Sequence, residues 1–405
     1  MNNDEIVSDV ITLIHSTTQS SYVICSQLSS KLFSYLSQIH LKDDQWNELK
    51  EAIERFDRSI DHPDVHQFRQ LIETISTCSN DCEERNYTLG RDRNTLNDSI
   101  RQLRDLLKSH VDLRCFLLTK LIEQQTIRLY LIDVMNLAGM NVGNQTHGNL
   151  FDIVRLLCQI DPTFPTSSVI DHPILLNCIQ YLYDNIKSTV ISALHLLTNI
   201  LLKNEPFPMQ TNSQLSNANF LTCMFQLIEN NYNDDELVMT TIKFLLSYNL
   251  RFDYPNTNPV ILTLIRINEQ LSCRQLIERL ILLFNRNIDP IEQKTTNSVI
   301  KFFADLFDDQ KNASDIILFD SDRRLMVEII SRELTDRSCT DGITTAYLSL
   351  LELIFRKKTI THETCTRFDE LQQSFQSYLS TEHCLSENRF IINEIIQQHN
   401  CFSLI

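Results

Sequence analysis

The stretch Asp322-Arg-Arg-Leu-Met-Val-Glu-Ile-Ile-Ser-Arg-Glu-Leu-Thr-Asp-Arg337 shows the pattern that decides the fold of this chain. Apolar residues alternate with arginines, and the arginines fall on the opposite side of a helix from the apolar residues. Apolar residues that gather on one side at a period of 3.6 are typical of an amphipathic helix. We therefore expect a helix over about 322–335, with its apolar face packed against other helices.

The same helical spacing recurs on both sides of this stretch. Near the start, Leu28, Leu32, Leu36 and Ile39 form one helical stripe, and a long helix is expected from about Asn94 to Leu137, with a break near His110. Beyond residue 149, short helices separated by short loops are expected at 149–159, 172–183, 188–203, 218–230, 235–250, 258–267, 272–285, 293–308, 312–319, 322–335, 341–356, 363–380 and 386–399. No segment alternates with period two for long enough to predict a strand.

The composition agrees with an all-α fold. The chain has 405 residues but 5 glycines, whereas average usage would give roughly 28. Hairpin turns and nucleotide-binding loops need glycine, and stacked helices do not. Pairs and triplets of short helices at this pitch are typical of an armadillo/HEAT-like helical solenoid. We expect such a solenoid, preceded by an amino-terminal helical bundle, although no strict repeat is visible in the sequence.

The clearest break in the chain lies at residues 138–149, which contain three of the five glycines. We therefore predict an amino-terminal helical region at 1–137, a linker at 138–148 and an armadillo-like leucine-rich domain at 149–401. The role of residues 1–137 stays open at this point.

Charge and cysteine usage restrict the partners and the compartment. The formal net charge is −16, which disfavours nucleic acid as a partner because its phosphates would be repelled. The most apolar segment, Val190 to Leu202, is interrupted by polar residues, so we expect a buried helix there and no membrane span. The 12 cysteines are scattered singly, and the first residues do not resemble a signal peptide. These features predict reduced core thiols and a cytoplasmic location.

Candidate catalytic, cofactor and metal sites all have simpler explanations. The loop Gly143–Gly148 has the glycine spacing of a phosphate loop but lacks the lysine and hydroxyl that must follow. Cys78 and Cys82 have no second pair at the distance that a zinc module requires, and His62 with His66 lacks the glutamate of a metalloprotease helix. We therefore expect no catalytic residue, no cofactor and no metal, and we expect that the protein is not an enzyme.

The remaining candidates for function are surface arginines. Arg323, Arg324, Arg332 and Arg337 are expected to form a basic stripe in an otherwise acidic protein. Arginine is enriched at protein interfaces, so we interpret these four residues as a partner-binding surface. The alternative is that they are solvated side chains that complement the helix dipole.

Four blocks in the carboxy-terminal half resemble a known family. These blocks are Leu282–Pro290, Val299–Phe307, Asp322–Asp336 and Thr345–Leu350. In order and spacing they resemble the leucine-rich domain of the WISH/DIP family, the Nck-interacting Src-homology 3 adaptor of animals and its yeast relatives. The resemblance covers roughly 149–400 and is specific over about 275–356. In the loop 337–341, Cys339-Thr340 stands where animal members have Pro-Gly.

The resemblance implies an armadillo-like domain that binds and activates the actin-related protein 2/3 complex. Family members activate that complex without a pre-existing filament, so that it nucleates a linear actin filament, and they have no chemistry of their own. The expected partners are thus the complex and an actin filament end, in the cytoplasm at the actin cytoskeleton. Residues 1–150 contain no Pro-x-x-Pro ligand and no Src-homology 3 domain is recognised, so adaptor recruitment by that route is not expected.

Two alternatives stay open. The chain is a generic armadillo-type adaptor without nucleation activity if the actin link has been lost. It is an enzyme with a helical fold only if a cleft brings together ionisable groups with strongly shifted pKa values. Asn285, Arg286 and Asp289, which lie between two of the expected helices, are predicted to form a structural turn.

Overall fold

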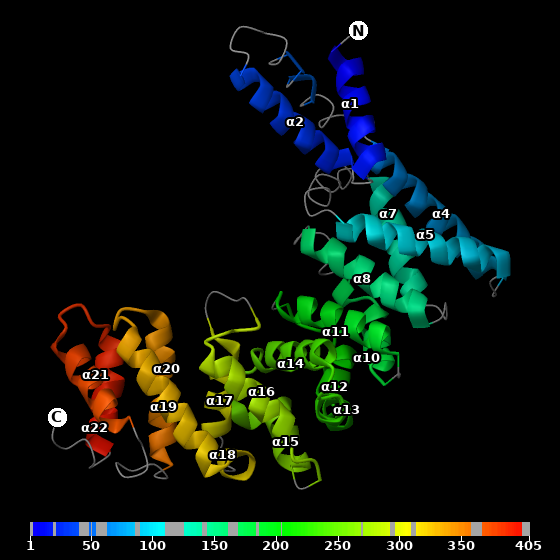
Figure 1. The fold of residues 1–405 in the computed structure, drawn as a ribbon. Coiled ribbons are helices and arrows are strands. Elements are labelled where there is room, and N and C mark those ends of the chain that lie inside the picture. Colours follow the sequence, from blue (N-terminus) through cyan, green and yellow to red (C-terminus); the bar gives the residue numbers. More distant parts are fainter. Residues whose placement is uncertain are drawn as a thin grey trace. The chain divides into compact units, whose positions relative to one another are not determined.

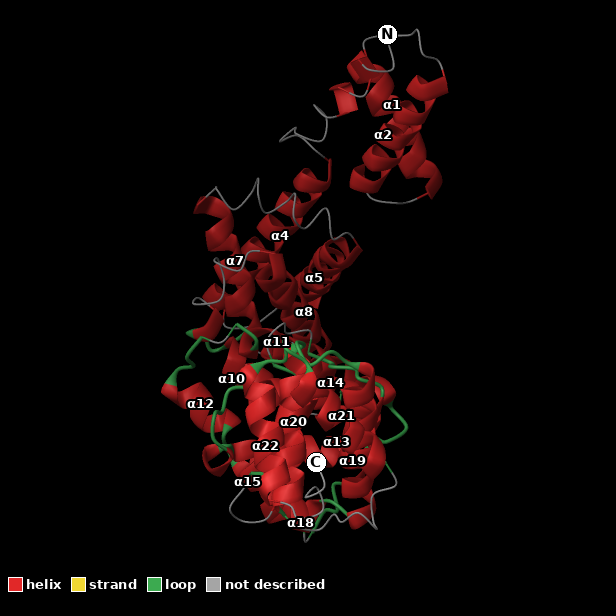
Figure 2. Ribbon diagram, turned by 90° about the vertical axis from the view of Figure 1, so that its left-hand side faces the viewer, coloured by secondary structure: helices red, strands yellow, loops and turns green. Residues whose placement is uncertain are grey.

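The computed structural model describes residues 3–18, 22–39, 48–49, 51–53, 63–85, 90–109, 125–139, 144–160, 169–183, 186–203, 205–268, 270–291, 296–308, 313–357 and 367–398. Within these ranges the chain consists of helices and loops, without a strand (Figure 2). The predicted all-α class is therefore confirmed. The chain divides into two compact units, Met1–Asn199 and Ile200–Ile405. We call them the amino-terminal unit and the carboxy-terminal unit and describe each by itself.

The amino-terminal unit is built from short groups of packed helices. Its helices are α1 (Asn3–Thr18), α2 (Tyr22–Ile39), α4 (Pro63–Arg85), α5 (Gly90–Ser109), α7 (Gln125–Ala138), α8 (Asn144–Ile160), α10 (Ile174–Tyr181) and α11 (Lys187–Leu201), the last of which crosses the division between the units. Helices α1 and α2 pack on each other, while α4 and α8 both contact α5 and α7. These groups confirm the predicted amino-terminal helical bundle.

The long helix predicted from Asn94 to Leu137, with a break near His110, corresponds to two described helices. Helix α5 ends at Ser109, close to the predicted break at His110, and α7 begins at Gln125. Residues 110–124 lie outside the described part of the chain. Both α5 and α7 pack against α4, and a straight helix of that length could not do so.

The predicted linker is partly helical, because α8 begins at Asn144 and includes residues 144–148. A Cβ atom on Gly148 would lie 3.3 Å from both the Cα and the Oγ1 of Thr189 in α11. The glycine therefore permits close packing of two helices. The division into compact units falls after Asn199, about fifty residues beyond the predicted boundary.

The carboxy-terminal unit contains the helices that the sequence predicted best. They are α12 (Met209–Leu215), α13 (Ala218–Asn230), α14 (Asp235–Asn249), the 3-10 helix η1 (Pro255–Thr257), α15 (Pro259–Ile267), α16 (Arg274–Asn285), α17 (Ser298–Phe307), α18 (Ala313–Ile317), α19 (Asp320–Asp336), α20 (Gly342–Arg356), α21 (Phe368–Ser380) and α22 (Ser386–Gln398). Side-chain oxygens of Asp234, Asn258, Asn297 and Asp341 accept backbone hydrogen bonds in the first turns of α14, α15, α17 and α20. These capping residues fix where the helices begin.

The helices of this unit form two rows (Figure 1). In the first row, α13 contacts α16, α16 contacts α19, and α19 contacts α21. In the second row, α14 contacts α17, α17 contacts α20, and α20 contacts α22. Neighbouring helices of the two rows also pack on each other, and α15 packs on α18. Each helix therefore meets its counterpart in the next repeat, which is the packing of an armadillo/HEAT-like solenoid.

The structure reveals a repeat length that the sequence did not. Most long-range side-chain hydrogen bonds in the described part of this unit join residues 44 to 50 positions apart. Arg274 binds Asp322 at a separation of 48, and Arg332 binds Asn285 at a separation of 47. Armadillo and HEAT repeats have about 40–47 residues. The spacing is therefore close to one repeat, carried by polar contacts rather than by recurring sequence.

Aromatic side chains fill the space between the rows. The ring centroid of Phe284 in α16 lies 5.6 Å from those of Phe303 in α17 and Tyr347 in α20. All three side chains are almost fully buried. Aromatic rings at such separations stabilise a core beyond the area that they bury.

None of the described helices has the length and apolarity needed to cross a bilayer.

Candidate protein-binding surfaces

Arg323 does not lie on a surface stripe, because only 4% of the residue is exposed. Its guanidinium donates to the carbonyl oxygens of Ser314 at 3.0 Å and Leu318 at 3.3 Å. It also pairs with the Asp315 and Asp320 carboxylates at 2.9 and 3.5 Å. Arg323 thus ties α18 to α19, and its predicted role on a basic stripe is corrected: it belongs to the interior.

Arg332 and Arg337 are half-buried and already paired. Arg332 donates to the side-chain and backbone oxygens of Asn285, at 3.0 and 2.7 Å. Arg337 donates to Glu333 and Asp341, each at 3.1 Å, and its guanidinium carbon lies 5.8 Å from the centre of the Tyr347 ring. Both arginines therefore join helices or cap a turn, and little of their charge is free for a partner.

Arg324 is the one arginine of the predicted four that is exposed. Two exposed apolar side chains belong to the same helix or its cap: Leu325, the next residue, is 41% exposed, and Phe319, five residues earlier, is 63% exposed. The guanidinium of Arg274 lies 4.8 Å above the Phe319 ring and is held there by two hydrogen bonds to Asp322. An exposed ring that is fixed in this way is pre-organised for contact with a partner.

The predicted structural turn after α16 is confirmed. Asn285 is the last residue of α16, and Asn287 adopts a left-handed conformation with φ of 52°. The Asp289 carboxylate accepts hydrogen bonds from the backbone N–H groups of Ile291 and Ser298 and from the Ser298 hydroxyl. The carboxylate therefore joins the turn to the start of α17.

A buried polar cluster in the second row was not predicted. Asn249 and Asn258 both donate to the Asp305 carboxylate, at 2.9 and 3.3 Å. Lys301 donates to both oxygens of that carboxylate at 2.7 Å and to the Phe252 carbonyl at 2.9 Å. Burial raises the pKa of Asp305, and the hydrogen bonds from Lys301 oppose that shift. The only signal in the sequence was Asn258 before Pro259, which is a helix start.

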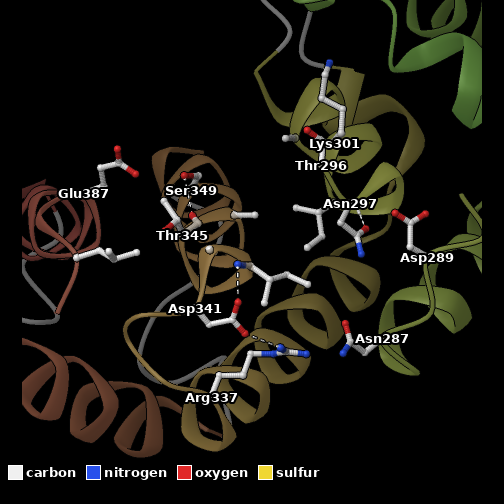
Figure 3. A pocket seen from close by; sticks show the side chains of 16 residues that line it. Asn287, Asp289, Thr296, Asn297, Lys301, Arg337, Asp341, Thr345, Ser349 and Glu387 are labelled. Carbon is white, nitrogen blue, oxygen red and sulfur yellow. Dashed lines mark hydrogen bonds and ion pairs between the residues drawn. The ribbon is translucent and has the colours of Figure 1, made fainter. Parts of the chain in front are cut away.

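A groove of about 880 Å³ opens beside this cluster (Figure 3). Its walls come from the turn after α16, the start of α17, and Leu385 and Glu387 at the start of α22. Along its floor, α20 presents the small residues Gly342, Thr345, Ala346 and Ser349. Lys301 and Arg337 also line it, but both are engaged by carboxylates. The groove is therefore open but offers no unpaired cation.

A second depression of about 370 Å³ continues the groove along α20 and shares Ser349 with it. Glu352, Leu353 and Arg356 of α20 line one side. The other side carries Phe390, Ile391, Glu394 and Gln398 of α22, and Phe390 is 66% exposed. The two depressions form one surface, which we call the α20 groove.

Candidate metal ligands and buried thiols and hydroxyls are the side chains that bear on a catalytic role. The described residues contain no group of three histidine, cysteine or acidic side chains that could hold a metal ion. Burial, followed by the Glu333 carboxylate, raises the pKa of Tyr347 to about 12. Burial raises the pKa of the Cys178 thiol and, together with the nearby Glu229, that of the Cys273 thiol to about 12. These thiols stay protonated at neutral pH and are poor nucleophiles.

The helix rows, the aromatic interior and the open surfaces define the class of protein, a helical-repeat scaffold. Within it, residues 234–371 match the family model described as SPIN90/Ldb17, leucine-rich domain. Residues 234–371 are therefore similar to the leucine-rich domain of that family, which confirms the resemblance inferred from the sequence blocks. The match runs from the cap of α14 to the first turn of α21, so it falls on the regular rows.

Two solved structures are similar to the chain at a greater distance. A crystal structure of an engineered protein is 12% identical, with a TM-score of 0.43 and 98% of each chain covered. A crystal structure of Kap121p bound to Nup53p is 10% identical, with a TM-score of 0.31, and covers 91% of this chain and 36% of that chain. At these TM-scores neither similarity carries a conclusion about this protein.

Proposed function

We propose that this protein binds the actin-related protein 2/3 complex and activates it to nucleate linear seed filaments. The observation that carries the proposal is the SPIN90/Ldb17 domain match over residues 234–371. The proposed setting is the cytoplasm at the actin cytoskeleton, where the new filament end would be the product. The protein acts as a scaffold, and its role is to bind.

The physical requirement for such an activator is modest. A protein shifts a two-state complex toward its active arrangement if it binds that arrangement more tightly than the inactive one. A preference of about 100-fold corresponds to roughly 2.7 kcal/mol, which a few contacts supply. No chemistry on the activator is needed.

The proposed contact surface is centred on Arg324 and Phe319. Arg324 is exposed on α19, and Phe319 is exposed at the start of the same helix with Arg274 fixed over its ring. Arginine and aromatic side chains are the types that dominate binding energy at protein interfaces. Of the four arginines predicted from the sequence, Arg324 is the one that we retain as the main contact, because the others are held within the fold.

The test is a pyrene-actin assembly assay with purified complex and no preformed filaments. We expect the wild-type protein to shorten the lag before actin assembly. The Arg324→Glu variant should shorten it much less. Arg101→Glu, which reverses a 60% exposed side chain in the amino-terminal unit, is the matched control and should leave the lag short. Arg323 is unsuitable for this test because its loss would disturb the fold. A wild-type protein that neither binds the complex nor shortens the lag contradicts the proposal.

The α20 groove favours a second candidate, a generic armadillo-type adaptor that binds partner segments without nucleating actin. Its supporting observation is the extent of the groove along α20 with an exposed aromatic ring at its side. Binding of partners without any change in actin assembly would favour this candidate.

A further inference from the structure

We infer that the α20 groove binds a cationic segment of a partner protein, with an apolar side chain of that segment placed against Phe390. This inference goes beyond the proposed actin activity, because it concerns α20 and α22 and not the Arg324 surface, and it deepens the second candidate by stating the chemistry of the segment that the groove binds. Its basis is the charge of the groove, the position of its acidic residues on α22, and the shape of its floor.

The groove carries an excess of negative charge. Its lining residues include six acidic side chains, namely Asp289, Asp308, Asp341, Glu352, Glu387 and Glu394, and three basic ones, namely Lys301, Arg337 and Arg356. Each basic side chain is already paired with a carboxylate: Lys301 with Asp305, Arg337 with Glu333 and Asp341, and Arg356 with Glu352 and Asp308. An incoming anion would therefore be repelled, and an incoming cation would be attracted.

The acidic residues of α22 are available to a partner. Glu387 makes no hydrogen bond or ion pair with the described residues, and Glu394 accepts one hydrogen bond, from Gln398 at 2.8 Å. Residues seven apart lie on the same side of a helix, separated by about 10.5 Å along its axis. Phe390 and Ile391 lie between them on that side. The face therefore presents an acidic residue, an apolar pair and a second acidic residue in line.

This order specifies the chemistry of the segment that fits. Two cations about 10 Å apart would meet Glu387 and Glu394, and an apolar side chain between them would cover Phe390. A lysine or arginine near the Phe390 ring would gain a cation–π contact as well. Phe390 is 66% exposed, so such a segment would bury apolar surface when it covers the ring.

The floor of the groove permits close approach. Gly342, Thr345, Ala346 and Ser349 recur at three- and four-residue spacing, so the backbone of α20 is exposed to contact along this side. From Gly342 to Arg356 the helix extends roughly 21 Å, enough for about six extended residues or four helical turns of a partner. A segment of that length spans both depressions and reaches Glu387 and Glu394 together.

The experiment uses the full-length chain and a fluorescein-labelled 14-residue peptide as probe. The peptide carries lysines at its third and tenth positions and leucines at its sixth and seventh, so that the charges match the spacing on α22. Fluorescence anisotropy at low and moderate salt measures its affinity. We expect binding that weakens as salt rises, because ion pairs at a surface are screened.

Two changes on α22 test the assignment. Glu387→Lys with Glu394→Lys should weaken binding about 30-fold, and Phe390→Ala should weaken it about 5-fold. Asp9→Lys with Glu73→Lys is the matched control, since both residues are exposed in the amino-terminal unit and the net charge changes equally. The control should retain wild-type affinity within about 2-fold. Circular dichroism confirms that each variant is folded.

Several outcomes overturn the inference. They are unchanged affinity in the Glu387→Lys and Glu394→Lys variant, an equal loss in the control, or tighter binding of a glutamate version of the peptide. Self-association of the chain that this double variant abolishes would make a second copy the occupant and also overturn it. The pyrene-actin assay separates this inference from the proposed function. A variant that loses the peptide but keeps the shortened lag supports a groove distinct from the Arg324 surface.

Discussion

The two compact units use polar contacts in different ways. In the described part of the carboxy-terminal unit, most long-range side-chain hydrogen bonds join residues 44 to 50 apart, as in Arg274 with Asp322. The described part of the amino-terminal unit shows no such majority, because separations of 34, 36, 39 and 57 occur beside those of 45 and 49. The carboxy-terminal unit is a repeated structure with equivalent interfaces between its helices. The amino-terminal unit is a bundle in which the contacts differ from one helix pair to the next. Side-chain bonds therefore reveal a repeat where sequence identity does not.

The largest expected effect is that of Arg323→Ala on the carboxy-terminal unit. The change removes two hydrogen bonds to the carbonyl oxygens of Ser314 and Leu318 and two ion pairs, so we expect a loss of about 3 kcal/mol in the free energy of unfolding. Hydrogen exchange with mass spectrometry in urea, read separately on peptides of each unit, measures it. The amino-terminal unit should be unchanged.

Arg324→Ala is the matched control, since it removes an exposed side chain one residue away. It should change the stability by no more than about 0.5 kcal/mol. Equal effects of the two substitutions would show that the buried contacts of Arg323 do not stabilise this unit.

A second prediction concerns pH, to which the two units should respond oppositely. In the amino-terminal unit, burial lowers the pKa of His172, and its Nδ1 accepts a hydrogen bond from the Ile174 N–H. A lowered pKa in the folded state contributes stability that is present above the ordinary value near 6.5 and is lost as pH falls below it. We expect acid to destabilise this unit, and His172→Gln to reduce that dependence.

In the carboxy-terminal unit the sign is reversed at Asp305, whose pKa is raised by burial. Its contribution is present below the ordinary value near 4 and is lost as pH rises through the raised folded-state value. Asp305→Asn should therefore flatten this pH dependence. Unfolding curves between pH 3 and pH 8, resolved by unit as above, check both directions, and a pH dependence that stays unchanged in either variant would contradict the assignment for that residue.

The smallest expected effect comes from one substitution made at a glycine in each unit. A Cβ atom on Gly342, the first residue of α20, meets no atom within 4 Å, so Gly342→Ala should stabilise its unit by about 0.5 kcal/mol. Gly148→Ala would press a methyl group against the backbone of α11 at Thr189, and we expect a loss of about 1 kcal/mol. Urea midpoints of the two variants measure the difference. The same sign in both would show that α8 and α11 can separate without cost.

The sequence predicted the helices of the carboxy-terminal unit because their periodicity and caps are local signals. At the start of α14, for example, the Asp234 carboxylate accepts a hydrogen bond from the Leu237 N–H at 3.2 Å. The arginines of α19 were misplaced because a helical stripe says which side a residue faces but not what lies there. The side on which Arg323 lies is covered by α18, a five-residue helix whose carbonyl oxygens receive it.

The groove was beyond prediction for a similar reason. Its residues come from the turn after α16 and from α17, α20 and α22, and the acidic residues of α22 have no meaning until α20 lies beside them. Local patterns fix elements, and only packing brings distant residues into one site.

The sequence separation of the side-chain hydrogen bonds between repeats affects how the carboxy-terminal unit deforms. Most of these hydrogen bonds join neighbouring repeats, so a displacement at α21 reaches α13 through the interfaces between them. Small rotations at successive interfaces add along the rows, as in other stacked-helix proteins. We therefore expect this unit to deform elastically. Its curvature should change to fit a bound partner and should return when the partner dissociates.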